Sequence, residues 1–238
     1  MSKRIDIKTR KHESWRIFDQ IAPTYDRINR VISFGTDKLW RRNFRKYLPQ
    51  RNGLVCLDLA TGTGDVAIEL AKDERVSKVV GTDLSEKMIE LGKEKIRRIT
   101  NSKKITFAIG DGVKIPGKSS MFDVVTVAFG IRNFKDHQES FKNMVRVLKK
   151  DGQAMILEFS LPRNRIFRSL YLFYFRNVLP VIGNKLSGHS DAYSYLNQTV
   201  EDFPYGEALV KQLLDAGFKR VETKTLSFGI AMLYIGYK

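Results

Sequence analysis

The feature that most constrains the fold is a series of short apolar runs that alternate with stretches of helical spacing. Five runs predict strands, at Leu54–Ala60, Val76–Asp83, Lys104–Ile109, Phe122–Ala128 and Gln153–Phe159. Between them, apolar residues recur with helical spacing over Val66–Lys72, Ser85–Ile99 and Gln138–Lys149. Continuous apolar strands that are joined through helices indicate a parallel sheet with both faces covered.

The C-terminal part of the chain departs from this alternation. A predicted helix over Tyr205–Ala216 is followed by two predicted strands, Lys219–Ser227 and Ala231–Tyr237, which only three residues separate. So short a connection permits a hairpin but not a parallel crossover. We therefore expect an α/β fold with a seven-stranded, mostly parallel sheet whose last strand runs antiparallel.

Composition excludes several classes of protein. The 238 residues include one Cys and three scattered His, so neither an internal disulfide nor a metal site is predicted. The N-terminus lacks an apolar signal region. No apolar window approaches the ~20 uncharged residues that a membrane-spanning helix requires. We therefore expect a cytoplasmic protein without a transmembrane segment.

Positive charge is concentrated in two parts of the chain. Lys and Arg number 42 against 26 Asp and Glu, which gives a net charge of +16. Residues 1–50 hold 13 basic and 5 acidic side chains, and residues 159–190 hold no carboxylate. Such stretches favour anionic surfaces such as nucleic acid or acidic lipid, but they also occur where charge only confers solubility. Charge alone does not choose among these alternatives.

A glycine-rich turn marks the candidate binding site. The segment Asp58-Leu59-Ala60-Thr61-Gly62-Thr63-Gly64-Asp65 joins the first predicted strand to a helix, and its glycines allow a tight turn and close approach of a ligand. Asp83 closes the second strand, where a carboxylate can accept hydrogen bonds from a ribose diol. Asp111-Gly112 follows the third strand. These three strand ends are expected to meet in one crevice.

The turn is unsuited to a phosphate group, because Asp65 stands where an anion would be repelled. A nicotinamide dinucleotide, or a turn with no ligand, remains an alternative. An acidic loop suits a cationic ligand such as S-adenosylmethionine (SAM), and the pattern resembles that of class I SAM-dependent methyltransferases. The resemblance implies strand order 3-2-1-4-5-7-6, SAM as methyl donor, and cofactor contacts from Asp58, Ala60, Gly62, Thr63, Gly64, Asp83, Leu84, Asp111, Gly112 and Ala128.

Longer motifs narrow the resemblance to one family. Residues 18–35, with Leu39-Trp40-Arg41 after them, are similar to the N-terminal signature of the UbiE/MenG family of quinone-biosynthesis C-methyltransferases. The likeness continues through Phe129–Asn133, Arg146–Gly152, Leu157–Ser160, Ala192–Leu196 and Phe203-Pro204. Two departures stand out. Lys150-Asp151-Gly152 replaces the usual Pro-Gly-Gly, and Ala128 replaces a Ser, which removes a hydroxyl near the cofactor.

The resemblance implies methylation of a prenylated aromatic ring, with demethylmenaquinol the best fit and a benzoquinol of the ubiquinone pathway as the alternative. Nucleobase N-methylation is disfavoured, because the Asn/Asp-Pro-Pro-aromatic motif does not follow the fourth strand. Two other readings stay open. One is an RNA- or protein-methylating enzyme of the same fold, although no nucleic-acid partner is expected, and the other is a non-catalytic SAM-binding partner.

Candidate catalytic residues follow from the chemistry. Ring carbon becomes nucleophilic when an ortho hydroxyl is deprotonated, so a cation or amide at the phenolate oxygen would assist. Arg132 and Asn133, just beyond the fourth strand, are the predicted donors. Arg132 could instead pair with a carboxylate such as Asp26 or Asp136. Tyr25, Asp26 and His189 are candidate bases, and Tyr25 is placed with Arg132 and Asn133 in the predicted catalytic set.

The chain is expected to form one structural domain. An N-terminal helical cap (1–50) precedes a methyltransferase domain (51–238), and that domain contains a helical insertion on the substrate side (161–204). Within that insertion, a 100° spacing puts Arg165, Arg168 and Arg176 opposite an apolar side. The predicted apolar side consists of Phe167, Leu170, Tyr171, Tyr174 and Val178. This helix could contact an anionic membrane or the prenyl tail, or it could pack in the core or a homodimer interface.

Overall fold

The computed structural model describes residues 14–115, 117–187 and 192–238, and its centre is a seven-stranded sheet of order β3-β2-β1-β4-β5-β7-β6. The strands are β1 (Leu54–Leu59), β2 (Val76–Asp83), β3 (Ile105–Ile109), β4 (Phe122–Ala128), β5 (Leu148–Phe159), β6 (Arg220–Leu226) and β7 (Ala231–Tyr237). The first five strands pair in parallel, and β7 pairs antiparallel with both β5 and β6. The predicted fold class and strand order are confirmed.

Helices cover both faces of the sheet. They are α4 (Asp65–Ala71), α5 (Glu86–Ile96), α6 (His137–Val147) and α10 (Glu207–Asp215), together with α3 (Thr36–Lys46) from the N-terminal part. Successive strand residues point to opposite faces. Cys56 of β1 therefore lies in the core with α3 and α4, whereas Leu57 lies in the core with α6 and α10. Burial of alternate residues in two cores fixes the register of the sheet.

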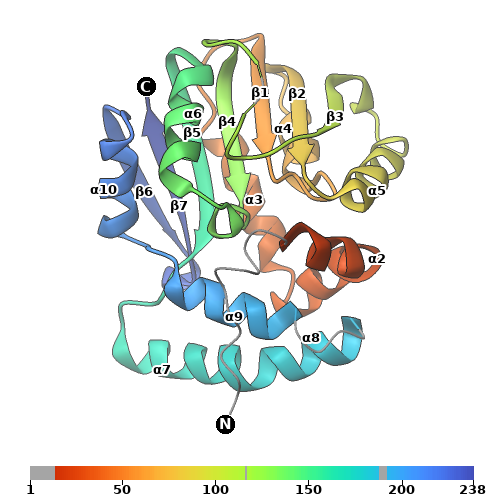
Figure 1. Cartoon of the computed structure of the whole chain (residues 1–238), viewed down its shortest axis with the longest axis vertical. Helices are drawn as coiled ribbons and strands as arrows, with labels where there is room; N and C mark the ends of the chain where they lie inside the picture. The colour runs from red at the N-terminus through yellow and green to blue at the C-terminus, as the bar shows by residue number, and fades with distance from the viewer. Residues whose placement is uncertain (1–13, 116, 188–191) are drawn as a thin grey trace.

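A third layer lies across the carboxyl ends of the parallel strands (Figure 1). It contains α2 (Ser14–Ile32), α7 (Arg165–Phe173), the π-helical turn Tyr174–Val178, α8 (Leu179–Ser187) and α9 (Ala192–Asp202). Its own small core includes Ile21 and Ile28 of α2 with Tyr171, Phe175 and Val200. An N-terminal helix and an internal helical segment from the second half of the sequence thus pack together over the edge of the sheet where ligands of open α/β folds bind.

Most predicted boundaries differ from the observed ones by a few residues. The largest difference is β5, which begins at Leu148 rather than Gln153. Leu148 pairs with Phe122, and the register with β4 then shifts where Asp151 adopts a φ of 61°. The bulged start of the strand, residues 148–152, is mostly polar and so lacks the continuous apolar run on which the prediction rested.

The structure divides the predicted apolar side of the insertion helix between a buried and an exposed edge. Tyr171 is 8% exposed, whereas its neighbour Leu170 is 65% exposed. The π turn at Tyr174–Val178 changes the angle between successive side chains, so a constant 100° spacing does not hold through it. Inner residues of this segment pack on α2, and other apolar side chains remain on the outer surface.

Candidate active site

The turn after β1 is held from within by Asp58. This carboxylate is buried and accepts hydrogen bonds from the hydroxyls of Thr61 and Thr126, each at 2.6 Å. Burial raises the pKa of Asp58 to about 6, although both hydroxyls lower it. Gly64 has a φ of 83° and ends the turn at the start of α4, where a Cβ would lie 2.5 Å from the Phe107 ring. Local geometry therefore requires glycine there.

Asp83 links the end of β2 to the same turn. Its carboxylate accepts hydrogen bonds from the backbone N–H of Gly62 at 2.8 Å and of Ser85 at 2.9 Å. Burial raises the pKa of Asp83, and these N–H groups oppose that shift. The residue thus fixes the turn and also faces a cavity, where lone pairs of its oxygens can reach a ligand.

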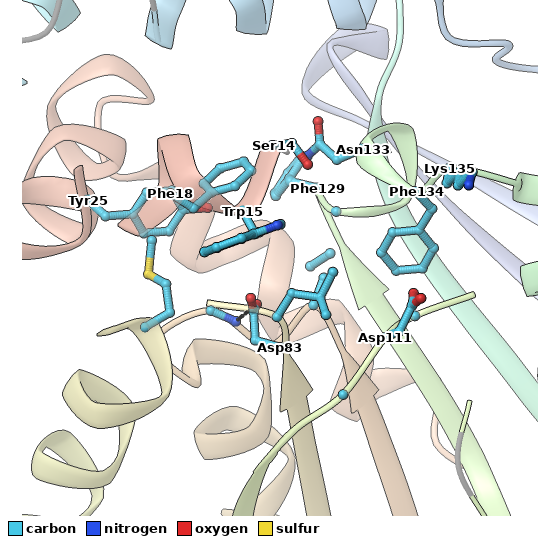
Figure 2. A pocket seen from close by; sticks show the side chains of 18 residues that line it. Ser14, Trp15, Phe18, Tyr25, Asp83, Asp111, Phe129, Asn133, Phe134 and Lys135 are labelled. Atoms are coloured by element: carbon cyan, nitrogen blue, oxygen red, sulfur yellow. Dashed lines mark hydrogen bonds between the residues drawn. The ribbon is translucent and has the colours of Figure 1, made fainter. Parts of the chain in front are cut away.

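An outer cavity of about 170 Å³ lies over these strand ends. Figure 2 shows its walls, with Asp83 and Asp111 from neighbouring strand ends and the Trp15, Phe18 and Phe134 rings around them. Of the predicted cofactor residues, it brings together Ala60, Gly62, Asp83, Leu84, Asp111, Gly112 and Ala128. Two carboxylates among apolar walls suit a nucleoside: a diol for the acids and a flat base for the aromatic and aliphatic side chains.

A small cavity behind the turn continues from the outer one and shares Ala60, Gly62 and Ala128 with it. Asp58, Thr61, Thr63, Asp65 and Arg41 complete most of its lining. It therefore joins the cavity suited to a nucleoside to a polar end with side chains of both charges. The outer cavity thus fits the nucleoside of SAM, and the small cavity fits its amino-acid end.

An inner cavity of about 70 Å³ lies on the other side of Tyr25 and Phe129. Its walls are mostly apolar, and they also contain the charged side chains Arg41, Asp37 and Arg132. The remaining lining residues are Ile17, Phe18, Ile21, Asn29, Ile32, Ser33, Trp40, Phe159 and Leu196. Tyr25 contributes to all three of these cavities, and burial raises the pKa of its phenol, although Arg41 and Arg132 lower it.

Arg132 is buried in the wall of the inner cavity and pairs with Glu158 at 2.8 Å. It also donates to the carbonyl of Phe129 and lies 5.5 Å from the Phe159 ring centroid. Neither Asp26 nor Asp136, the partners considered from the sequence, forms this pair. Asp26 binds Lys95 and Thr63, and Asp136 caps α6.

Glu158 was missed by the sequence analysis. It is 1% exposed, and burial raises the pKa of its carboxyl against the lowering effect of Arg132. A lone carboxylate within an apolar strand was the available signal, because a buried charge requires a partner. The Nε of Arg132 and the Oε2 of Glu158 are buried and have no hydrogen-bond partner among the described residues.

Of the other predicted catalytic residues, Tyr25 shares the inner cavity with Arg132, and the rest lie elsewhere. Asn133 lines the outer cavity, while Tyr25 stands between the cavities. Asp26 faces Lys95 rather than the inner cavity. His189 lies outside the described residues.

An ion-pair cluster ties the N-terminal helices to the turn. Lys95 binds both Asp26 of α2 and Asp65, and Arg30 binds both Asp37 and Asp65. Asp65 lines the small cavity, and these pairs show that its charge is also matched by cations of the protein itself. Burial opposes ionisation, but Lys95, Arg41 and Arg30 together hold the pKa of Asp65 well below its ordinary value. Partners on α2 and α3 could not be assigned from sequence spacing.

The strand order and the cavities at the strand ends define the protein as a class I SAM-dependent methyltransferase. A solved SAM-dependent methyltransferase from Thermotoga maritima has the same fold, with a TM-score of 0.65, 21% identity, and coverage of 94% of this chain and 99% of that one. One from Aquifex aeolicus gives a TM-score of 0.61 at 18% identity, with coverage of 89% and 97%.

The chain belongs to the ubiE/COQ5 methyltransferase family, whose model matches residues 6–238. It is 46% identical to the ubiquinone/menaquinone biosynthesis C-methyltransferase UbiE of Geotalea uraniireducens, over 93% of this chain and 94% of the relative. It is 40% identical to the demethylmenaquinone methyltransferase of Bacteroides fragilis, over 94% and 91%. Membership confirms the predicted family, the enzyme class and the use of SAM as methyl donor.

Proposed function

We propose that the protein transfers the methyl group of SAM to a ring carbon of a prenylated quinol, with demethylmenaquinol as its substrate. The observation that carries this proposal is the inner cavity: aromatic and aliphatic walls surround the buried cation Arg132 beside the cavities that fit SAM. Both the UbiE and the demethylmenaquinone methyltransferase relatives support a quinone substrate in menaquinone or ubiquinone biosynthesis.

Methyl transfer to carbon requires an electron-rich ring. A quinol hydroxyl first gives its proton to water, and the phenolate then raises electron density at the ortho carbon. That carbon would form a bond to the methyl group as the S–CH₃ bond breaks, and the sulfonium would leave as a neutral thioether. The methylated ring carbon then gives its proton to water and the ring oxygen takes one up, so that the aromatic ring and its hydroxyl are restored and one proton is released overall.

Arg132 is suited to the first of these steps. Its guanidinium stays charged, and Glu158 and the Phe129 carbonyl hold it in one orientation. A fixed cation in a dry cavity stabilises a developing oxyanion more strongly than water does. We therefore assign Arg132 to the phenolate oxygen, with Tyr25 at the edge of the boundary across which the ring carbon meets the methyl donor, and Asn133 on the SAM side.

The third layer offers a path for the prenyl tail. Ile17, Ile21, Ile32 and Leu196 line the inner cavity from α2 and α9, away from the strand ends. An isoprenoid chain on this path would remain in apolar surroundings as it leaves the ring site.

We also propose that the outer surface of α7 and α8 contacts an anionic membrane. Apolar side chains exposed by 64–76% stand there beside basic ones: Ile166, Leu170, Phe173 and Val181 with Arg163, Arg165 and Arg168. Apolar groups among cations, with no carboxylate between residues 159 and 190, suit an acidic lipid surface. Among the described residues, no helix is long and apolar enough to span a bilayer.

Vesicle flotation tests the membrane contact. Leu170→Glu should reduce binding to vesicles that contain phosphatidylglycerol, whereas Leu214→Glu, at an exposed site on α10, should not. Equal binding of both variants would contradict the proposed surface. A homodimer is the competing use of this face, and analytical ultracentrifugation of the same two variants separates it from lipid binding.

Turnover tests the reaction. Purified protein, SAM and a reduced short-chain demethylnaphthoquinol, kept without oxygen, should yield the C-methylated naphthoquinol, identified by mass spectrometry and NMR. A benzoquinol and mixed RNA serve as competing substrates. Methylation of RNA instead of quinol, methylation on oxygen, or SAM binding without turnover would each refute the proposal.

A further inference from the structure

The small cavity behind the turn contains one basic side chain, Arg41 of α3, among its described lining residues. Arg41 is 8% exposed, so its charge is largely removed from bulk water. Buried charges are retained where they have partners. The guanidinium of Arg41 therefore requires acceptors close to it.

Asp37 fixes the orientation of Arg41. Both described hydrogen bonds of the guanidinium come from Nη1, one to the Asp37 carbonyl at 3.2 Å and one to its carboxylate at 2.5 Å. The Nε lies 3.9 Å from an Asp65 oxygen, and the Phe129 ring centroid lies 5.6 Å away. Guanidinium has five N–H donors in a fixed fork, so this arrangement leaves donors for a further acceptor.

The ion-pair cluster around Arg41 is balanced in charge. Arg30, Arg41 and Lys95 face three carboxylates, those of Asp26, Asp37 and Asp65. Arg30 and Lys95 line none of the three cavities described above, whereas Arg41 lines two of them. Arg41 is thus the cation of this cluster that a bound molecule can reach.

SAM carries one group that such a cation would recognise. Beyond its nucleoside and sulfonium, the methionyl end has an ammonium and a carboxylate. A planar carboxylate matches the forked donors of arginine. The turn contributes acidic side chains and glycine backbone to the same cavity, but Arg41 supplies its positive charge.

We propose that Arg41 binds the carboxylate of the methionyl end of SAM, so that the N-terminal helix α3 contributes directly to the cofactor site. The inference rests on the use of SAM by this enzyme and is independent of the identity of the quinol. It also gives the Leu39-Trp40-Arg41 motif a role beyond packing, because Trp40 packs in the core and reaches the inner cavity only, whereas Arg41 faces both the inner and the small cavity.

The experiment compares SAM with decarboxylated SAM, which differs from it only in the missing carboxylate. Calorimetry should show that the wild-type protein prefers SAM by about 10-fold or more, as expected for charge-assisted hydrogen bonds. In Arg41→Met this preference should fall close to one, with the affinity for decarboxylated SAM nearly unchanged. Arg41→Lys, which keeps the charge and can still pair with Asp37, should show an intermediate preference.

Arg30→Met is the matched control. Arg30 pairs with the same two carboxylates as Arg41, yet it lines none of the cavities. Its substitution should lower the melting temperature but preserve the preference for SAM. If Arg30→Met abolishes the preference as fully as Arg41→Met, the cluster acts through structure and the proposal fails.

Two further outcomes would overturn the proposal. Arg41→Met could weaken both ligands equally, which would indicate a distorted turn. It could instead leave both affinities unchanged and reduce turnover alone, which would assign Arg41 to the quinol in the inner cavity. Failure of the wild-type protein to bind SAM would refute the proposed function itself, so the two failures are distinguishable.

Discussion

Removal of the Glu158 carboxylate provides a quantitative test of the buried pair in the inner cavity. Glu158→Ala leaves the guanidinium of Arg132 in the protein interior without its partner, where the two side chains are 1% and 6% exposed. Breaking a buried pair in this way costs about 3–5 kcal/mol of unfolding free energy. In a domain of this size, the melting temperature should fall by roughly 10 °C.

The exposed pair Arg176–Glu201 is a matched control, because its geometry is similar, at 2.7 Å, but the side chains are 55% and 32% exposed. Glu201→Ala should therefore cost less than about 1 kcal/mol. Urea unfolding followed by circular dichroism measures both variants. Comparable losses for Glu158→Ala and Glu201→Ala would refute the argument from burial.

A double variant separates stability from activity. Arg132→Met with Glu158→Leu replaces both charges by apolar side chains, which should recover most of the stability lost in Glu158→Ala. Methyl transfer should nevertheless remain lost, because the cation assigned to the phenolate oxygen is gone. A double variant as unstable as Glu158→Ala, or one that retains full turnover, would contradict this account.

Two more predictions concern the turn. Gly64→Ala should destabilise the protein by about 1 kcal/mol more than Gly53→Ala and weaken SAM binding: both glycines have positive φ, but only Gly64 would place a Cβ against Phe107. Equal unfolding free energies would contradict this. The pKa of Asp65 is depressed from an ordinary 3.8, so its stabilisation is present above pH 3.8 and lost as pH falls further. In Asp65→Asn, the unfolding free energy should therefore fall less steeply as the pH is lowered below 3.8. The same pH dependence as in the wild-type protein would refute a stabilising role of the Asp65 charge.

Patterns within one element carried most of the fold prediction. The bounds of β4 and β7 match the predicted ranges, because an uninterrupted apolar run between turn residues is a local signal. Seven of the predicted cofactor residues were also found from local patterns, because they stand at strand ends, and the structure brings them to one cavity. Topology alone places such residues, once the strand order is known.

Long-range side-chain pairs were not predictable in this way. Glu158 pairs with Arg132 across 26 positions, and Lys95 reaches Asp26 across 69. Such contacts depend on how helices cross the sheet, and no spacing rule within an element encodes that. The π turn at Tyr174–Val178 was likewise not predictable, because a constant helical spacing contains no signal for it.

The helix α2 covers both the outer and the inner cavity. Trp15 faces the outer cavity, Ile17 and Ile21 face the inner one, and Phe18 faces both. A displacement of α2 that is large enough to release the thioether product from the outer cavity would also open the inner cavity, where the ring is proposed to bind. With donor and quinol in the two cavities as proposed, release of the thioether would therefore also open the inner cavity to water or to fresh quinol.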